Sequence, residues 1–304
     1  MDNNKHQVVC FGEVLWYILP SKTMPGGAPL NVAYHLKKLG NEPILITRVG
    51  VDNFGKKLFD KMDEYNLSAD YFQLDYKLQT GKVHATQHQN DEMHYDIVHP
   101  VAWDNIQWQQ EFDSLLPTIT FFVFGSLSIR CASSKNTLYK FIENTSSYKV
   151  LDINLRPPHF NRTTIECVLK DTDLLKLNQA ELELITGWFT KEETLEDRIQ
   201  ILQDRFRIPS IVVTRGSKGA ILNVKGELFE HPGFKVKVLD TIGSGDAFLA
   251  AMIDQSLKGK PFTETLTYAS ALGALVAGYS SACPDYKTSA INDLINTNTC
   301  NQIN

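Results

Sequence analysis

Several signals that mark large classes of protein are missing from this sequence. The five cysteines are widely spaced and include no CxxC pair, which argues against a disulfide framework and against a zinc site built on such pairs. No apolar stretch approaches the length of a membrane span, and the N-terminus does not join a cationic start to a long apolar run. We therefore expect reduced thiols and a cytoplasmic location.

An excess of basic residues is also missing. The net charge is −5, so no long-range field draws the chain toward nucleic acid or an anionic membrane. We expect small-molecule partners instead of nucleic acid or membrane. With 304 residues, 43% of them hydrophobic, the chain is long enough to bury a large α/β core.

Short β-branched or aromatic runs alternate with helical patterns through most of the chain. Repeated strand and helix units favour a mostly parallel sheet covered by helices. Strands are expected at 7–14, 42–50, 120–127, 148–154, 173–178, 210–216 and 234–240, a hairpin over 219–232 turning at Lys225 and Gly226, and helices at 55–66, 135–145, 180–187 and 194–206.

Two segments break this alternation. Residues 14–24 and 80–100 read as polar, alternating strands with no helix between them, which suits a small sheet with one exposed face. Such a sheet could form a lid over a site. Histidines at 84, 88, 94 and 99 do not have the spacing of a metal site, so we expect exposed lid residues.

Residues 240–254 read DTIGSGDAFLAAMID and form the most informative motif. An expected strand leads to Gly243, Ser244 and Gly245, and an apolar pattern of helical period follows. Two familiar phosphate-binding patterns are absent. One is GxxxxGK followed by Ser or Thr, and the other is the dinucleotide fingerprint, because Phe248 stands where that pattern needs its third glycine. Because glycine lets backbone approach a ligand and helix-start N–H groups favour an anion, the loop could cradle a transferring phosphate.

Asp246 stands in the first helical turn after this loop. From there its carboxylate could accept the proton of an attacking hydroxyl while the glycine amides stabilise charge on the phosphoryl oxygens. The alternative is that Asp246 only caps the helix, a common role for aspartate. The loop alone does not decide between these roles, so other motifs must.

The segment DTIGSGDAF resembles the C-terminal signature of the ribokinase, or PfkB, carbohydrate kinase family. Residues 26–40, GGAPLNVAYHLKKLG, resemble that family's first signature, two glycines followed by an asparagine on a helix. A helix agrees with the residues themselves, because Pro29 suits its first turn and Gly40 its C-terminal cap. Two signatures far apart in the chain and in the family's order make the resemblance specific.

Intermediate matches extend the resemblance over nearly the whole chain. It implies a ribokinase-like α/β fold, a three-layer αβα sandwich with a mostly parallel central sheet. The chain would form a single domain over 1–304, with lid segments at about 14–24 and 80–100 inserted in it.

The same resemblance implies the residues of a kinase site. Asp246 would be the general base, with Gly243, Ser244 and Gly245 as the anion hole and Arg156, in DINLRPP, beside the sugar and phosphates. ATP and Mg²⁺ would be required, with Glu181 holding Mg²⁺ through water, and Asp240 would lie beside a monovalent cation such as K⁺. Nucleotide contacts are implied at Asn178, Thr214, Gly216, Gly219, Gly243 and Gly245.

Within the family, the segments FGEVLW, GGAPLNVA and NLRPP are most similar to bacterial fructokinases. This similarity implies transfer of the γ-phosphoryl group of MgATP to D-fructose, giving fructose 6-phosphate and ADP. Family lids often meet across a dimer, so a homodimer through the lid is expected. Substrate contacts are implied at Glu13, Tyr17, Gly26, Gly27, Asn31, Arg156 and Asp246.

Tyr17 departs from the fructokinase pattern. Such sequences usually read GEVLxD, where the aspartate accepts hydrogen bonds from vicinal sugar hydroxyls. Each hydrogen bond to a charged group is worth roughly 1.5 to 3 kcal/mol, so its loss weakens sugar binding unless Glu13 or another group compensates. Two alternatives to a fructokinase stay open: a kinase for another sugar, sugar acid or nucleoside, and a non-catalytic sugar or nucleotide sensor on the same scaffold.

Overall fold

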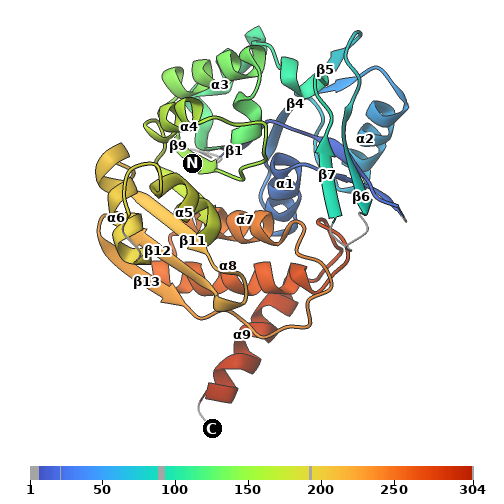
Figure 1. The fold of residues 1–304 in the computed structure, drawn as a ribbon. Coiled ribbons are helices and arrows are strands. Elements are labelled where there is room, and N and C mark those ends of the chain that lie inside the picture. The colour runs from blue at the N-terminus through green and yellow to red at the C-terminus, as the bar shows by residue number, and fades with distance from the viewer. Residues whose placement is uncertain (1–6, 21, 88–92, 192–193, 303–304) are drawn as a thin grey trace, which may run out of the picture. The chain divides into compact units, whose positions relative to one another are not determined.

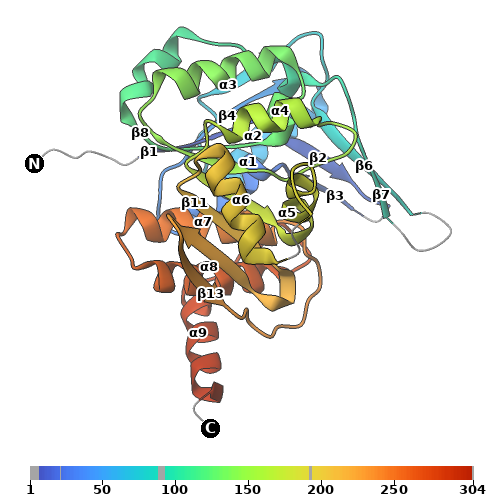
Figure 2. The same cartoon turned by 60° about the vertical axis from the view of Figure 1, so that its left-hand side comes forward.

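A computed structural model describes residues 7–20, 22–87, 93–191 and 194–302. The chain separates into two compact units, Met1–Ser147 and Tyr148–Asn304. Figures 1 and 2 label the helices and strands of both units.

The first unit contains four parallel strands in the order β8-β1-β4-β5. Val9 in β1 lies between Ile44 and Phe122 of its two neighbours. The central strands β1 and β8 are almost continuously apolar because both faces of a parallel sheet are covered, whereas the edge strand β5 alternates apolar and polar residues. Their bounds are β1 (Gln7–Phe11), β4 (Ile44–Gly50), β5 (Phe72–Asp75) and β8 (Ile119–Gly125).

Helices of the first unit lie where the sequence predicts, although α2 and α3 begin two and three residues earlier than expected. Pro29 lies in the first turn of α1, and Gly40 follows its end with φ 92°. The N–H of Asn41 donates to Leu36 O and that of Gly40 to Lys37 O, the Schellman pattern. The helices are α1 (Ala28–Lys38), α2 (Asn53–Glu64) and α3 (Ala132–Asn144), with 3₁₀ turns η1 (Ala102–Asn105), η2 (Gln110–Ser114), η3 (Leu116–Thr118) and η4 (Ser126–Ile129).

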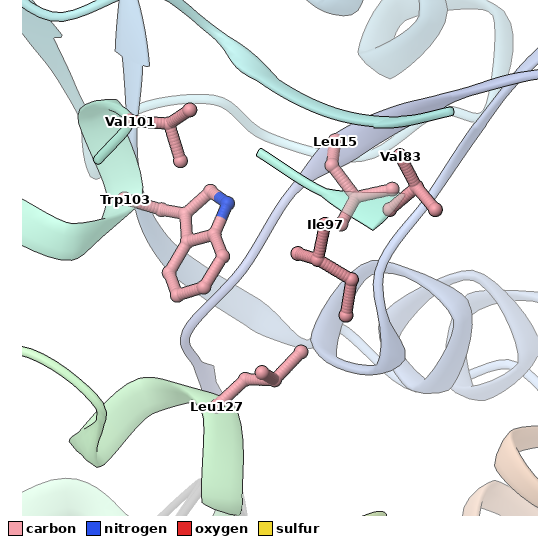
Figure 3. Packing of buried hydrophobic residues seen from close by; sticks show 6 residues of the cluster. All are labelled: Leu15, Val83, Ile97, Val101, Trp103 and Leu127. Carbon is pink, nitrogen blue, oxygen red and sulfur yellow. The ribbon is translucent and has the colours of Figure 1, made fainter. Parts of the chain in front are cut away.

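A separate four-stranded sheet, ordered β3-β2-β6-β7, confirms the small sheet expected from the two polar segments. One of its faces is covered by a buried cluster that Figure 3 draws: Leu15, Val83 and Ile97 from the sheet lie near Trp103 and Leu127. The strands are β2 (Leu15–Ile18), β3 (Thr23–Gly26), β6 (Gly81–Gln87) and β7 (Met93–Ile97).

The second unit has three parallel strands, β9-β10-β11, followed by the antiparallel strands β12 and β13. The predicted hairpin is confirmed, with both turn residues at positive φ, 51° at Lys225 and 93° at Gly226. The strands are β9 (Tyr148–Asp152), β10 (Leu174–Asn178), β11 (Ser210–Thr214), β12 (Ala220–Val224) and β13 (Glu227–His231).

Helices α7 and α8 pack side by side in this unit (Figure 2). Both are rich in small residues, which lets the two backbones approach closely. The helices are α4 (Arg162–Leu169), α5 (Gln179–Thr186), α6 (Leu195–Phe206), α7 (Ser244–Leu257), α8 (Phe262–Ala277) and α9 (Ser289–Gln302), with the 3₁₀ turn η5 (Gly216–Lys218).

The strand predicted at 234–240 is wrong. This segment is irregular, and Val238 and Leu239 are exposed. The backbone N–H groups of Leu239 and Asp240 donate to Ala277 O at the end of α8. They therefore pair with a carbonyl of the helix terminus and not with a neighbouring strand. Alternation of polar and apolar residues was therefore not enough to make a strand here.

None of the helices in the described residues is both long and apolar enough to cross a membrane.

Candidate active site

The glycine loop leads directly into α7. Gly243 is the N-cap residue, with φ 81°, a left-handed conformation that favours glycine. A side chain at this position would also collide with backbone, because an ideal Cβ would lie 2.6 Å from Cα of Ala282. Both observations explain why the motif requires glycine here.

Hydrogen bonds hold the loop in place. The hydroxyl of Ser244 donates to Gly273 O of α8 over 2.9 Å, and the carboxylate of Asp240 accepts from the N–H of Ile242 over 3.0 Å. Asp240 is thus part of the loop's own structure. Its predicted role beside a monovalent cation stays a prediction.

Backbone N–H groups at this helix start are the predicted anion hole. The N–H of Ser244 donates to Thr241 O over 3.2 Å, so it is already used in a turn. Among the residues that the structure describes, none is recorded as accepting from the N–H of Gly243 or Gly245. These two groups are therefore the better candidates for binding an anion.

Asp246 lies in the first turn of α7 and is buried, with 9% of its surface exposed. The interpretation of Asp246 as the helix cap is wrong, because Gly243 occupies the cap position. Burial and the nearby Asp246 carboxylate together raise the pKa of the Cys283 thiol well above its usual value. Asp246 thus places a buried carboxylate directly after the glycine loop, and its role as a base stays a prediction.

Lys176 is a functional candidate that the sequence motifs did not single out. Its Nζ donates to both carboxylate oxygens of Asp152, over 2.9 and 2.8 Å. Burial disfavours the charged form, but the carboxylates of Asp152 and Asp246 outweigh it and hold the pKa of Lys176 above its usual range. A Cβ added at Gly245 would lie 2.9 Å from this Nζ, so the ammonium lies against the glycine loop.

The sequence marks each residue of this pair as unusual, but the pairing itself comes from the strand register. Lys176 and Asp152 are register partners on the parallel strands β10 and β9. The apolar run LLKLN contains a lysine, and the strand YKVLD ends in an aspartate. Charged side chains are rarely buried in such strands unless each has a partner of opposite charge.

Asn178 and Glu181 form a capping box at the start of α5. The N–H of Glu181 donates to Asn178 Oδ1, and the N–H of Asn178 donates to Glu181 Oε2, both over 2.9 Å. Glu181 Oε1 accepts from the N–H of Leu155 over 2.8 Å. Burial raises the pKa of Glu181 in spite of these bonds.

Arg156 lies in an exposed turn after β9. Its guanidinium donates to the neighbouring Leu155 O over 3.3 Å. The structure does not record a contact between this guanidinium and the glycine loop, so its role near the phosphates stays a prediction.

The other predicted nucleotide residues follow β11. Thr214 is its last residue, and Gly216 and Gly219 have positive φ, 57° and 80°. Gly219 has a structural reason to be glycine, because an added Cβ would collide with His231 O. Gly216 has no atom within 4 Å of an added Cβ, so only its backbone conformation favours glycine.

Most of the predicted sugar residues lie in the first unit, while Arg156 and Asp246 belong to the second. Glu13 and Asn31 are buried, with 2% exposure each. Glu13 Oε1 accepts from the N–H of Ala28 over 3.3 Å, and a side chain on Gly27, the N-cap of α1, would collide with Glu13 O. The segment after β1 and the start of α1 are thus held together by these contacts.

Tyr17 and Gly26 also meet in this unit. They lie on the paired strands β2 and β3. A Cβ on Gly26 would lie 2.9 Å from Cδ2 of Tyr17, so the ring covers the glycine. Tyrosine in place of the aspartate of the fructokinase pattern therefore changes the surface above Gly26, which is predicted to touch the sugar.

Comparison with known proteins decides the family. The model of the pfkB family carbohydrate kinases matches residues 7–289. The chain belongs to the pfkB family of carbohydrate kinases. It is therefore a phosphotransferase with an alcohol acceptor, and the predicted sugar kinase activity is confirmed at this level.

Relatives of this pfkB kinase include plant fructokinases. It is 27% identical to probable fructokinase-7 of Arabidopsis thaliana, over 95% of this chain and 92% of the relative. It is 25% identical to fructokinase-1 of Zea mays, over 95% of this chain and 97% of the relative. The resemblance to fructokinases inferred from the N-terminal segments is thus confirmed.

Solved structures show the same fold. The fructokinase of Xylella fastidiosa with bound ATP has a TM-score of 0.87 at 22% identity, covering 97% of this chain and 99% of that one. The Vibrio cholerae fructokinase bound to fructose, ADP and calcium has a TM-score of 0.82 at 22% identity, covering 96% and 100%. The predicted ribokinase-like α/β fold, with a large mostly parallel sheet and a small separate sheet, is confirmed.

Proposed function

We propose that this pfkB kinase transfers the γ-phosphoryl group of ATP to the primary hydroxyl of D-fructose, giving fructose 6-phosphate and ADP. The observation that carries the proposal is the buried carboxylate of Asp246 in the first turn of α7, directly after the glycine loop. Relatives named fructokinase support the choice of sugar.

Each residue of the site has a distinct part in this proposal. Asp246 accepts the proton of the fructose hydroxyl. At the same time the hydroxyl oxygen bonds to the γ-phosphorus, and the bond between that phosphorus and the oxygen that stays with ADP breaks. The N–H groups of Gly243 and Gly245 stabilise charge on the transferring phosphoryl oxygens. The positive charge of Lys176 interacts with the carboxylate of Asp246 and balances the negative charge of the site.

The residues proposed to contact a nucleotide and a divalent metal lie in the second unit. A crystal structure of a related kinase from E. coli contains ATP and Mg²⁺. Glu181 fits a water-mediated role toward Mg²⁺, because both of its carboxylate oxygens already accept backbone N–H groups. A bound Mg²⁺ would neutralise charge on the phosphates.

A second candidate rests on Tyr17. Its ring covers Gly26 and offers no carboxylate for vicinal hydroxyls. This observation favours another sugar, a sugar acid or a nucleoside as acceptor, or a sensor that binds without phosphoryl transfer.

A coupled ADP-release assay with MgATP and a panel of sugars, sugar acids and nucleosides tests the proposal. We expect fructose to give the highest kcat/KM. A higher value for a different acceptor would replace fructose, whereas ligand-induced thermal stabilisation without turnover of any compound would favour a sensor.

A further inference from the structure

Three potential metal ligands meet in the first unit. His99 follows β7, Asp104 lies in η1, and Cys131 is the N-cap of α3. One ligand atom from each lies within 4.8 Å of the other two. His99 Nε2 and Cys131 Sγ are 3.1 Å apart.

These separations suit a small cation. Zinc bonds to nitrogen, oxygen and sulfur of about 2.0 to 2.3 Å place tetrahedral ligands about 3.4 to 3.6 Å apart. The three side chains therefore need shifts of only about 1 Å to reach this geometry. His99 is exposed and Cys131 is half-buried, which gives an ion a path from solvent.

Asp104 is already held in position. Its Oδ1 accepts from Arg130 Nε over 2.6 Å, and its Oδ2 accepts from Arg130 Nη2 and the N–H of Val101. The Arg130 guanidinium stacks on Trp103, 3.8 Å from the ring centroid, and Trp103 is part of the buried cluster in Figure 3. Such hydrogen bonds orient a ligating carboxylate, and Oδ1 keeps a lone pair for an ion.

The Asp104 carboxylate lies close to the Cys131 sulfur. A divalent ion between them would stabilise both as negative ligands. The positive charge of Arg130 opposes the ion, which limits the affinity.

We propose that His99, Asp104 and Cys131 form a zinc-binding site, with water as a fourth ligand. A bound ion would join the loop after β7, η1 and the start of α3. The site does not depend on the proposed kinase activity. Its mixed nitrogen, oxygen and sulfur ligands suit Zn²⁺ better than Mg²⁺, which prefers oxygen alone.

Zinc titration of the full chain tests this site. The protein would carry no polyhistidine tag, be stripped of metal and kept reduced, and be titrated with ZnCl₂ without nucleotide by calorimetry. We expect one zinc ion per chain with micromolar affinity and a rise in Tm. His99→Asn and Cys131→Ser should each weaken binding at least about tenfold, and serine is itself a favoured N-cap, so α3 should be kept.

Matched controls use the same substitutions at exposed positions. His84→Asn and Cys167→Ser should bind zinc as the unmodified chain does. Loading with Co²⁺ should give a thiolate-to-cobalt charge-transfer band that Cys131→Ser abolishes and Cys167→Ser retains. Failure to bind zinc stoichiometrically, or binding that the His99 and Cys131 variants leave unchanged, would overturn the proposal.

Discussion

Lys176 sets the charge balance around Asp246. Asp152, Glu181 and Asp246 all interact with its ammonium, and Asp152 binds it through both oxygens. Removing a cation from water is costly, and here carboxylates offset that cost. Without Lys176, these carboxylates would repel one another in a buried place.

Lys176→Met removes this charge and keeps most of the side-chain volume. We expect the free energy of unfolding to fall by roughly 3 to 5 kcal/mol, because Asp152 is left buried without its partner. Phosphoryl transfer should fall at least about tenfold. Urea unfolding and the ADP-release assay measure the two effects.

The double variant Asp152→Asn/Lys176→Met is the control, since it leaves neither charge of the pair. It should regain part of the lost stability. A single variant as stable as the unmodified chain would show that Lys176 does not hold the charge balance.

Tyr17→Asp tests whether the tyrosine limits fructose binding. The new carboxylate could accept hydrogen bonds worth roughly 1.5 to 3 kcal/mol each, so we expect kcat/KM for fructose to rise at least about tenfold. Tyr17→Phe keeps the ring without a carboxylate and should give no gain. If Tyr17→Asp also gives none, another acceptor or another group at the sugar site becomes the better explanation.

The turn before α7 is the element on which the site is built. Its shape depends on Gly243, whose left-handed conformation and contact with Ala282 both exclude a side chain. Gly259, just after the same helix, also has a positive φ, 64°, but has no atom within 4 Å of an added Cβ. The two glycines lie at opposite ends of α7. Comparing them distinguishes the cost of a left-handed backbone, which both share, from the cost of a steric collision, which only Gly243 has.

Gly243→Ala should therefore destabilise the chain more than Gly259→Ala. The second substitution carries only the left-handed conformational cost, about 1 to 2 kcal/mol, while the first also displaces the loop. Urea midpoints and kcat measure the difference. Equal losses in both variants would mean that the contact with Ala282 is not needed.

The turn after β5 depends on the ionised form of Asp75. Burial alone would raise the pKa of Asp75, but the N–H groups of Leu78 and Lys77, Asn105 and the Arg48 guanidinium outweigh it and lower the pKa from 3.8 to about 2. Because the folded-state pKa is depressed, the stabilisation is complete above 3.8 and is lost as the pH falls through about 2.

Asp75→Asn should accordingly have a lower free energy of unfolding than the unmodified chain near neutral pH. This gap in free energy should close between pH 4 and 2. Urea unfolding across this range measures it, and Asp60→Asn, at an exposed position of α2, should show no such gap. A gap that persists unchanged to the lowest pH would contradict a role for the charge.

Elements with strong local signals could be predicted from the sequence. Pro29 and Gly40 marked the ends of α1, and Lys225 and Gly226 marked the hairpin turn. The segment 234–240 was predicted wrongly because its backbone hydrogen bonds go to the end of α8, which no local pattern shows. The Lys176–Asp152 pair and the ring of Tyr17 over Gly26 depend on pairing between strands, so they required the structure.

For the molecule as a whole, the two signatures predicted the fold and family correctly. They did so because a glycine loop joined to a helix start is a local feature with a specific sequence. The lid dimer, the monovalent cation at Asp240 and the cytoplasmic location stay predictions. Residues 88–92, which include His88, lie outside the described part of the chain, as does the side chain of His94.

The account depends most on Asp246, and Asp246→Asn tests it most directly. Fructose-dependent ADP release should be measured with the variant and the unmodified chain, together with ATP binding in the same preparations. We expect kcat to fall at least about a hundredfold, the lower range for a general base, with ATP affinity nearly unchanged. A variant that binds ATP normally and turns over fructose at a near-normal rate would contradict the role of Asp246 as the base.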